Sequence, residues 1–426
     1  MERNDPRYQA YVEILKEELI PAMGCTEPIA LAYAAAKARE VLGVLPDSVQ
    51  LQVSGSIIKN VKSVIVPNTG HLKGMEAAVA AGIIAGSAEK ELEVISEVSE
   101  EKKSAIRDYL QTVPITIEHT EQGHVFDIVV TERCGQDYAR VRIADYHTNI
   151  CRIEKNGTVL YEVPLLDETV QEDARADRSL LNMQDIWDFA ETADLRDVAD
   201  LLERQVRYNN AIAEEGLLGD YGANIGRVLL TTYGNDVSNR AKAKAAVGSD
   251  ARMNGCELPV IINSGSGNQG ITCSVPLIEY AKELHSGKEK LYRALIISNL
   301  VAIHEKTGIG TLSAYCGAVS AGAGAGAGIV YLCGDGYQAA IHTVVNALAI
   351  VSGIVCDGAK ASCAAKIASS VDAALLGYNM YKCNQEFKGG DGIVMKDIET
   401  TIKGIGRLGK DGMKETNEEI IRLMIE

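Results

Sequence analysis

Three cysteines in the last third of the chain have a spacing and neighbours that suit an inorganic cofactor. Cys316, Cys356 and Cys363 are separated by 40 and 7 residues, and Gly317 and Gly358 lie beside them. Seven residues make about two helical turns, so the last two thiols could face one point. Three thiolates would leave one iron of a [4Fe–4S] cluster open, and an open iron acts as a Lewis acid. Three inert core cysteines are the alternative, because free cysteine is commonly buried.

Cys25 is a further candidate because it directly precedes a predicted helix. It lies in the segment Gly24-Cys-Thr-Glu-Pro28, where Thr26 could cap the helix and Glu27 suits its first turn. Free N–H groups and the helix dipole are expected to lower the pKa of a thiol at this position. Cys25 is therefore a candidate thiolate base, and a core thiol between two helices is the alternative.

Two polar segments could bind the carboxylate of a substrate. The loop Asn263–Gly270 carries small hydroxyls, amides and free backbone N–H groups, although an ordinary turn between helices would have a similar composition. The segment Asp145–Asn149 places an imidazole and an amide at a strand edge, where a surface histidine is the alternative. The candidate side chains are Ser264, Asn268 and Gln269 in the first segment, and, as weaker candidates, His147 and Asn149 in the second.

The elements around these residues predict an α+β fold. Residues 7–42 have the periodicity of two helices, residues 49–66 and much of 91–165 resemble strands, and residues 73–86 form an Ala-rich helix. After residue 180 nearly every pattern is helical, and the polar stretch at 165–178 marks the best boundary. The predicted organisation is an N-terminal helical segment (1–47), a mixed α+β domain (48–170) and a predominantly all-α catalytic domain rich in Ala/Gly helices (171–426).

The run Ala321–Gly328 alternates alanine and glycine. This pattern favours buried helices whose backbones touch, and a flexible linker is the alternative. The surrounding stretch, residues 307–334, has no charged residue and is long enough to cross a membrane. Half of that stretch is glycine or alanine, so its transfer free energy would be small, and no membrane span is expected.

The overall composition narrows the class of partner. The 426 residues carry 42 basic and 58 acidic side chains, a net charge of −16 that repels phosphate backbones, so nucleic acid is not expected as a partner. The ten cysteines include no Cys-x-x-Cys pair, and the chain opens without a secretory signal. We therefore expect a cytoplasmic protein with free thiols.

Three segments together resemble the L-cysteine desulfidase family, which is similar to the alpha-subunit domain of iron–sulfur L-serine dehydratases. They are Gly24–Pro28, Ser264–Gly270 and Cys356-Asp-Gly-Ala-Lys-Ala-Ser-Cys363. The resemblance implies an oxygen-sensitive lyase that splits L-cysteine into pyruvate, ammonia and sulfide. It implies a [4Fe–4S] cluster on Cys316, Cys356 and Cys363, and a catalytic role for Cys25. Serine dehydratases space their last two cluster cysteines more widely, which favours cysteine over serine as the substrate.

Other functions remain open from the sequence. An L-serine dehydratase of the same iron–sulfur type is the nearest alternative. A pyridoxal-phosphate lyase would use Lys242 or Lys244 as its imine, although these residues and Lys59 are better interpreted as solvated surface charges. A non-enzymatic iron–sulfur sensor or amino-acid-binding protein is the third alternative. The expected partner is a small amino acid, and a homodimer is possible.

Overall fold

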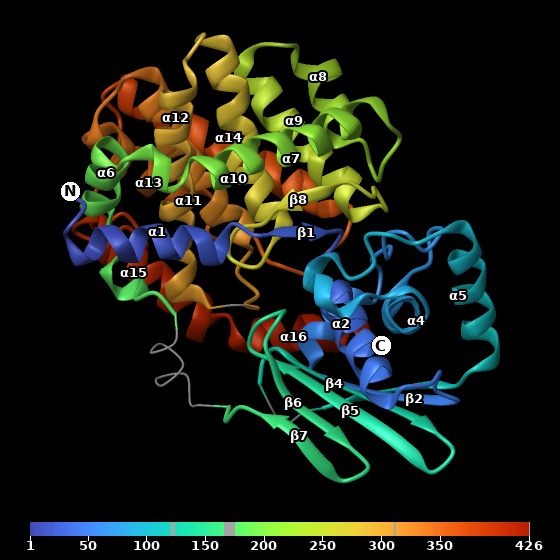
Figure 1. Cartoon of the computed structure of the whole chain (residues 1–426). Coiled ribbons are helices and arrows are strands. Elements are labelled where there is room, and N and C mark those ends of the chain that lie inside the picture. Colours follow the sequence, from blue (N-terminus) through green and yellow to red (C-terminus); the bar gives the residue numbers. More distant parts are fainter. Residues whose placement is uncertain (121–123, 166–174, 311, 426) are drawn as a thin grey trace.

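The computed structural model of the chain describes residues 1–120, 124–165, 175–310 and 312–425. Its fold is α+β, as predicted. A mixed sheet with its covering helices makes up the N-terminal part, and helices dominate after residue 180. In Figure 1 the sheet lies at the bottom of the molecule, with the helical body above it.

Six strands form the sheet: β2 (Ser48–Val53), β3 (Ile115–His119), β4 (Asp127–Cys134), β5 (Asp137–Ala144), β6 (Ile150–Lys155) and β7 (Thr158–Glu162). Their order is β3-β2-β4-β5-β6-β7. β2 and β3 are parallel, and the other neighbouring pairs are antiparallel. Helix α2 (Thr26–Leu42) packs against β4 and β5, so the sheet supports the helix that begins next to Cys25.

One further helix of this part agrees with the sequence prediction, and one strand does not. The predicted Ala-rich helix is α4 (Gly74–Ala85), and α5 (Glu100–Thr112), capped by Ser99, follows it. The strand predicted through residue 66 ends at Val53, and α3 (Gly55–Val61) follows it. Every residue of α3 is buried, so tertiary packing overrides the local strand preference of its sequence.

The helical body is built around α12, which carries the Ala/Gly run and packs against α10, α11, α13 and α14. A Cβ at Gly324 would lie 2.4 Å from the Ser298 carbonyl oxygen, and a Cβ at Gly326 would lie 2.8 Å from the Ala374 Cβ. The prediction of buried helices with touching backbones is confirmed. The helices are α6 (Met183–Thr192), α7 (Ala199–Leu218), α8 (Ile225–Tyr233), α9 (Val237–Met253), α10 (Gly267–Glu283), α11 (Lys288–Ile309), α12 (Gly317–Cys333), α13 (Tyr337–Val351), α14 (Ser362–Lys382) and α15 (Ile398–Arg407).

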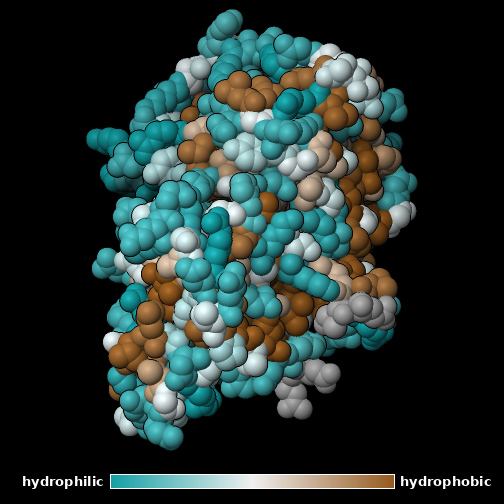
Figure 2. Space-filling view, turned by 90° about the vertical axis from the view of Figure 1, so that its right-hand side faces the viewer, coloured by the Kyte–Doolittle hydropathy of each residue, from teal (hydrophilic) through white to brown (hydrophobic). Residues whose placement is uncertain are grey.

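The surface agrees with the expectation that no helix crosses a membrane. Among the described residues, no helix combines the length and the apolar character that a membrane span needs. Figure 2 shows one face of the molecule, on which hydrophilic side chains surround separate hydrophobic patches.

Both chain ends connect the sheet part with the helical body. Helix α1 (Pro6–Glu18) lies on the helical body, where the Tyr8 and Tyr11 rings contact Phe189. The last helix, α16 (Lys414–Ile425), returns to pack on α3. Figure 1 shows α16 below the helical body, next to the sheet part. The boundary predicted at 165–178 includes residues 166–174, which lie outside the described residues.

Candidate active site

Four helices begin where the sheet part meets the helical body. Cys25 is the N-cap residue of α2, and Cys316 is the N-cap residue of α12. Ser266 is the N-cap residue of α10, and Cys363 is the second residue of α14. Helix N-termini present free N–H groups and a partial positive charge, so together they favour thiolates and anionic ligands.

Short antiparallel pairings hold these helix starts in place. β1 (Pro21–Met23) pairs with β8 (Pro259–Ile261), directly before Cys25 and the loop Asn263–Gly270. A second pairing joins residues 314–316 to residues 354–356, and there the Cys356 N–H donates to a backbone carbonyl at 2.6 Å. These pairings place segments from opposite ends of the sequence around one site.

Two glycines are required by the backbone at this site. Gly24 has φ +57°, and a Cβ there would lie 2.8 Å from the ring of Pro67. Gly358 has φ +94°, and a Cβ there would lie 2.1 Å from the Lys59 carbonyl oxygen. Glycine adopts this left-handed region at little cost, so both positions allow the cysteine segments to approach their neighbours closely.

Glu27 lies at the centre of a buried hydrogen-bond network. The Cys25 thiol donates to Oε2 at 2.9 Å, and the Asn60 amide donates to Oε1 at 3.0 Å. The Thr26 hydroxyl lies 3.2 Å from Oε2, and His147 Nε2 lies 3.9 Å from Oε1. Burial opposes ionisation of Glu27, but His147 and Cys25 outweigh it and lower its pKa to about 2. Glu27 is therefore a carboxylate at neutral pH.

The expectation that Cys25 has a lowered pKa is wrong. Burial, with the Glu27 carboxylate, raises the pKa of this thiol well above its ordinary value, although the Arg252 guanidinium acts in the opposite direction. The expected cap differs as well, because Cys25 and not Thr26 occupies the N-cap position. The thiol turns to Glu27 and donates its proton there. Desolvation therefore outweighs the helix N-terminus at this position.

Cys316, Cys356 and Cys363 lie in one neighbourhood. Burial raises the pKa of Cys316 to about 12, and the Cys356 and Cys363 sulfurs add to this effect. Burial likewise raises the pKa of Cys363, with Cys356 acting in the same direction. Cys363 packs against the same small apolar cluster that contains Cys25. All ten cysteines are free thiols, as expected.

These three cysteines do not form a site for a single metal ion. In the ranges that the structure describes, no group of three or more His, Cys, Asp or Glu side chains is arranged to hold one. A single zinc ion would need its sulfur ligands at about 2.3 Å, whereas an iron–sulfur cluster separates its thiolates by its own width. The chemistry of this all-thiol donor set fits a cluster, and the predicted spacing of the three sulfurs stays a prediction.

Three buried cations lie around the cysteines, and their hydrogen-bond acceptors are neutral. Lys59, Arg252 and Lys306 are 2%, 2% and 7% exposed. Lys59 Nζ donates to Asn417 Oδ1 at 2.6 Å. Arg252 Nη1 donates to Asn268 Oδ1 at 3.1 Å, and Lys306 Nζ donates to a backbone carbonyl. Burial lowers the pKa of all three, that of Lys306 to about 8.

Such an excess of buried positive charge favours a bound anion or thiolates, because burying a charge without a counter-charge is costly. Both cysteines Cys316 and Cys356 act on Lys306 so as to keep it charged. This charge balance is a second observation that suits a cluster of thiolates. The interpretation of Lys59 as a solvated surface charge is wrong, because this residue is buried.

The loop Asn263–Gly270 lies beside the Glu27 network, where the Thr26 hydroxyl is 3.0 Å from the Gly265 carbonyl oxygen. Asn268 contacts Arg252, as described, and Gln269 lies against Gly317. The Ser264 hydroxyl donates to Asn263 Oδ1 at 2.9 Å within the loop. Three buried atoms near this loop have no hydrogen-bond partner among the described residues: Arg252 Nε, His147 Nε2 and Gln269 Oε1.

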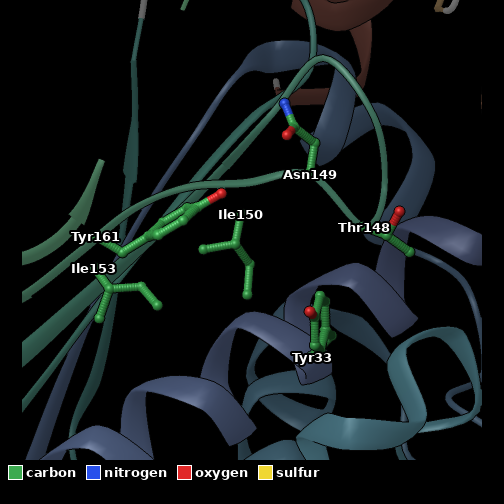
Figure 3. Close-up of a pocket in the computed structure, with 6 residues that line it drawn as sticks. All are labelled: Tyr33, Thr148, Asn149, Ile150, Ile153 and Tyr161. Carbon is green, nitrogen blue, oxygen red and sulfur yellow. The ribbon is translucent and has the colours of Figure 1, made fainter. Parts of the chain in front are cut away.

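Asn149 lies away from these residues. Its amide donates to the Ala144 carbonyl oxygen at 2.9 Å, and it lines a pocket of about 320 Å³ together with Tyr33 and Tyr161. Figure 3 shows Thr148 and Asn149 on the loop above Tyr33 of α2, with the Asn149 side chain directed away from Tyr33. The structure therefore brings His147 to the cysteine site and leaves Asn149 at a separate pocket.

The lysines proposed for a pyridoxal-phosphate imine are held in ion pairs. Lys242 Nζ lies 2.6 Å from Asp372, and Lys244 Nζ lies 2.7 Å from Glu214 and 2.9 Å from Glu279. Within the described part of 180–426, the one strand is β8, which is antiparallel to β1. The helical body therefore lacks, in its described residues, the parallel sheet that this alternative predicts.

Sequence reasoning missed four residues of the site: Glu27, Asn60, Arg252 and Lys306. The signal for Glu27 was present, because it lies in the segment Gly24–Pro28 directly after Cys25. Its position in the first helical turn suggested only that it stabilises the start of the helix. The other three residues carry no local signal, since only their burial beside the cysteines marks them.

Comparisons with known proteins identify the family of the chain. Residues 89–422 match the family described as serine dehydratase alpha chain, and the chain belongs to this family. It is 61% identical over 425 residues to a UPF0597 protein of Desulfitobacterium hafniense, covering 100% of this chain and 98% of the relative. A UPF0597 protein of Lachnoclostridium phytofermentans is 52% identical over 418 residues (98% and 100%), and one of Treponema denticola is 46% identical over 431 residues (100% and 100%). The family assignment supports a lyase of the dehydratase type.

Proposed function

We propose that the protein is an iron–sulfur-dependent lyase that eliminates sulfide from L-cysteine. The observation that carries this proposal is the meeting of four helix N-termini, which surround three neighbouring thiols with buried cations beside the Cys25–Glu27 pair. Elimination would give aminoacrylate and hydrogen sulfide, and water would convert aminoacrylate into pyruvate and ammonia. The 7-residue spacing of Cys356 and Cys363 favours L-cysteine, while the family's name makes L-serine the competing substrate.

Cys316, Cys356 and Cys363 would hold a [4Fe–4S] cluster as thiolates. When bound, the cluster supplies a Lewis acid that stabilises the leaving sulfur of the substrate. Lys59 and Lys306 would favour the thiolate forms of Cys316 and Cys356 with the cluster bound, because a nearby positive charge favours the deprotonated form. Their burial makes this effect stronger than it would be in water.

Cys25 and Glu27 act together as the base. In the substrate-free protein the proton lies on the Cys25 sulfur, which donates to the Glu27 carboxylate. As the Cα proton of the substrate moves to the Cys25 sulfur, the thiol proton moves to Glu27 Oε2. The pair thereby gains one proton and loses one negative charge. His147, next to Glu27, stabilises the carboxylate before the transfer.

The experiment compares anaerobically purified variants for iron, acid-labile sulfide, and the release of sulfide and pyruvate from L-cysteine. Cys356→Ala is expected to lose the iron and the activity together. Cys25→Ser is expected to keep its iron and lose about 100-fold or more of its turnover, the usual contribution of a general base. Cys383→Ala, a change at an exposed cysteine, is the matched control and should resemble the wild type.

Two results would contradict the proposal. Iron content of Cys356→Ala equal to that of the wild type would remove this residue from the cluster. A wild-type protein that carries iron and sulfide but releases ammonia from L-serine alone would replace desulfidation by dehydration.

A further inference from the structure

The three partnerless buried atoms near the loop Asn263–Gly270 differ in chemistry. Arg252 Nε is a donor on a cation, and His147 Nε2 is a ring nitrogen that can donate. Gln269 Oε1 is an acceptor. Their side chains are 2%, 7% and 5% exposed, so solvent reaches them little. Buried polar atoms are nearly always hydrogen-bonded, so three such atoms in one region indicate a missing ligand.

Two glycines of this loop lie against two of these side chains. A Cβ at Gly267 would lie 2.2 Å from Arg252 Nε, and a Cβ at Gly265 would lie 3.1 Å from the His147 ring. Gln269 follows two residues after Gly267, in the first turn of α10. The absence of side chains at both glycines leaves the space in which the arginine and the histidine lie.

We propose that Arg252, His147 and Gln269 bind the charged groups of a free α-amino acid. Arg252 Nε and His147 Nε2 donate to its carboxylate, and Gln269 Oε1 accepts from its ammonium group. Two donors and one acceptor complement this zwitterion, which offers acceptors at one end and donors at the other. The Arg252 guanidinium, whose observed acceptor is the neutral Asn268, gains a counter-charge in the same step.

The inference rests on the proposed function, because it concerns the same site and names the class of its substrate. The position of Arg252, His147 and Gln269 predicts how the amino acid is oriented in the site. The ligand's charged end would lie at the loop, and the side chain would point from there toward the cysteines. The same carboxylate would lie near His147, which already contacts the Glu27 network at 3.9 Å.

The test measures equilibrium binding to the full chain by isothermal titration calorimetry, with no turnover required. L-alanine is the probe, because it carries both charged groups and has no β-leaving group. Propionate, which lacks the ammonium group, isolates the carboxylate contact. Arg252→Gln is expected to weaken the binding of both ligands by about 10- to 100-fold, the range for a lost hydrogen bond to a charged group.

Gln269→Leu separates the two ends of the ligand. It is expected to weaken L-alanine binding by about 10-fold and to leave propionate binding within twofold of the wild type. Arg252→Lys keeps the buried positive charge but loses Nε, so it tests recognition if Arg252→Gln folds poorly. It should bind L-alanine about 10-fold more weakly while retaining the wild-type melting temperature. Arg240→Gln, at a surface ion pair with Glu283, is the control and should bind as the wild type does.

The outcomes distinguish this inference from the proposed function. L-alanine binding by folded Arg252→Gln or Arg252→Lys within twofold of the wild type would overturn the inference, and so would a wild type that does not bind L-alanine. Arg252-dependent binding of L-alanine by a protein that acts on neither L-cysteine nor L-serine would support the inference and overturn the proposed function.

Discussion

Two buried carboxyl groups in different regions of the molecule have opposite environments. Glu27, where the sheet part meets the helical body, accepts hydrogen bonds from Cys25 and Asn60, and its pKa is lowered to about 2. Glu305, on α11 inside the helical body, is 1% exposed. Both of its carboxyl oxygens have no hydrogen-bond partner in the described ranges. Burial raises its pKa well above the ordinary value, and the Ser320 hydroxyl offsets only part of this effect.

The difference shows that burial alone does not define a reactive group. Burial favours the neutral form of both carboxyls, and only donors and nearby charge can reverse that preference. The region around Glu27 supplies donors and a nearby cation, whereas Glu305 lies near the Ser320 hydroxyl, the Cys273 thiol and the Tyr315 hydroxyl, which carry no charge. Glu27, beside the cysteines, is therefore a fixed carboxylate, and Glu305, in the helical body, is a neutral carboxylic acid.

The largest expected effect is on turnover in Glu27→Gln. This change keeps the size of the side chain and removes the proton acceptor of Cys25, so the release of sulfide from L-cysteine should fall by about 100-fold or more. The iron content should stay at the wild-type level, because Glu27 is not among the proposed cluster ligands. Sulfide and iron assays on the same anaerobic preparation measure both quantities.

Glu305→Gln is the matched control for that experiment. It makes the same chemical change at a buried carboxyl of the other region, and its turnover should remain within twofold of the wild type. If Glu27→Gln retains more than half of the wild-type turnover, the proton relay is wrong. If both variants lose activity equally, the contrast between the two regions does not concern catalysis.

The fold was largely predictable because its regions have long, regular patterns. The helical body follows from helical periodicity after residue 180, and the touching backbones of α12 follow from the run Ala321–Gly328. The region at α3 was not predictable, because Ile57, Ile58 and Val61 suit a strand locally and are placed in a helix by burial on all sides. Local sequence preference is decisive only where tertiary packing does not oppose it.

The proximity of the cysteines was predictable, and the buried charges around them were not. Glycine neighbours and helix starts marked Cys25 and Cys363, which the structure places in one apolar cluster. The direction of the Cys25 pKa was wrong, because a helix N-terminus is visible in the sequence and desolvation is not. For the same reason Lys59 and Arg252 were not recognised as buried, since most lysines and arginines are solvated.

The next effect in size is on the stability of the helical body. In Gly324→Val, the Cβ would lie 2.4 Å from the Ser298 carbonyl oxygen, a backbone group that cannot rotate away. Overpacking of this kind should lower the free energy of unfolding by about 1–3 kcal/mol or more. Urea unfolding followed by circular dichroism measures the loss. Gly336→Ala, where a Cβ meets open space, is the control, and equal stability of the two variants would argue against close helix contact.

The most gradual expected effect, at most about 1.4 kcal/mol for each pH unit, is on the pH dependence of stability, and it has opposite signs at the two carboxyls. Glu305 keeps its proton in the folded chain at pH values where the unfolded chain, with an ordinary pKa of 4.5, has lost it. The folded state therefore binds more protons, and the free energy of unfolding falls as the pH rises above about 4.5. For Glu27 the folded pKa of about 2 lies below 4.5, so its contribution is present above pH 4.5 and is lost as the pH falls toward 2.

Urea unfolding of the wild type, Glu305→Gln and Glu27→Gln across this pH range measures both contributions. Glu305→Gln cannot lose a proton, so its stability relative to the wild type should increase as the pH rises above 4.5, by at most about 1.4 kcal/mol per pH unit. Glu27→Gln should differ most from the wild type above pH 4.5 and approach it at lower pH. Parallel curves for Glu305→Gln and the wild type would mean that the Glu305 carboxyl titrates alike in both states. The buried acid of the helical body would then be solvated, and the contrast with Glu27 would disappear.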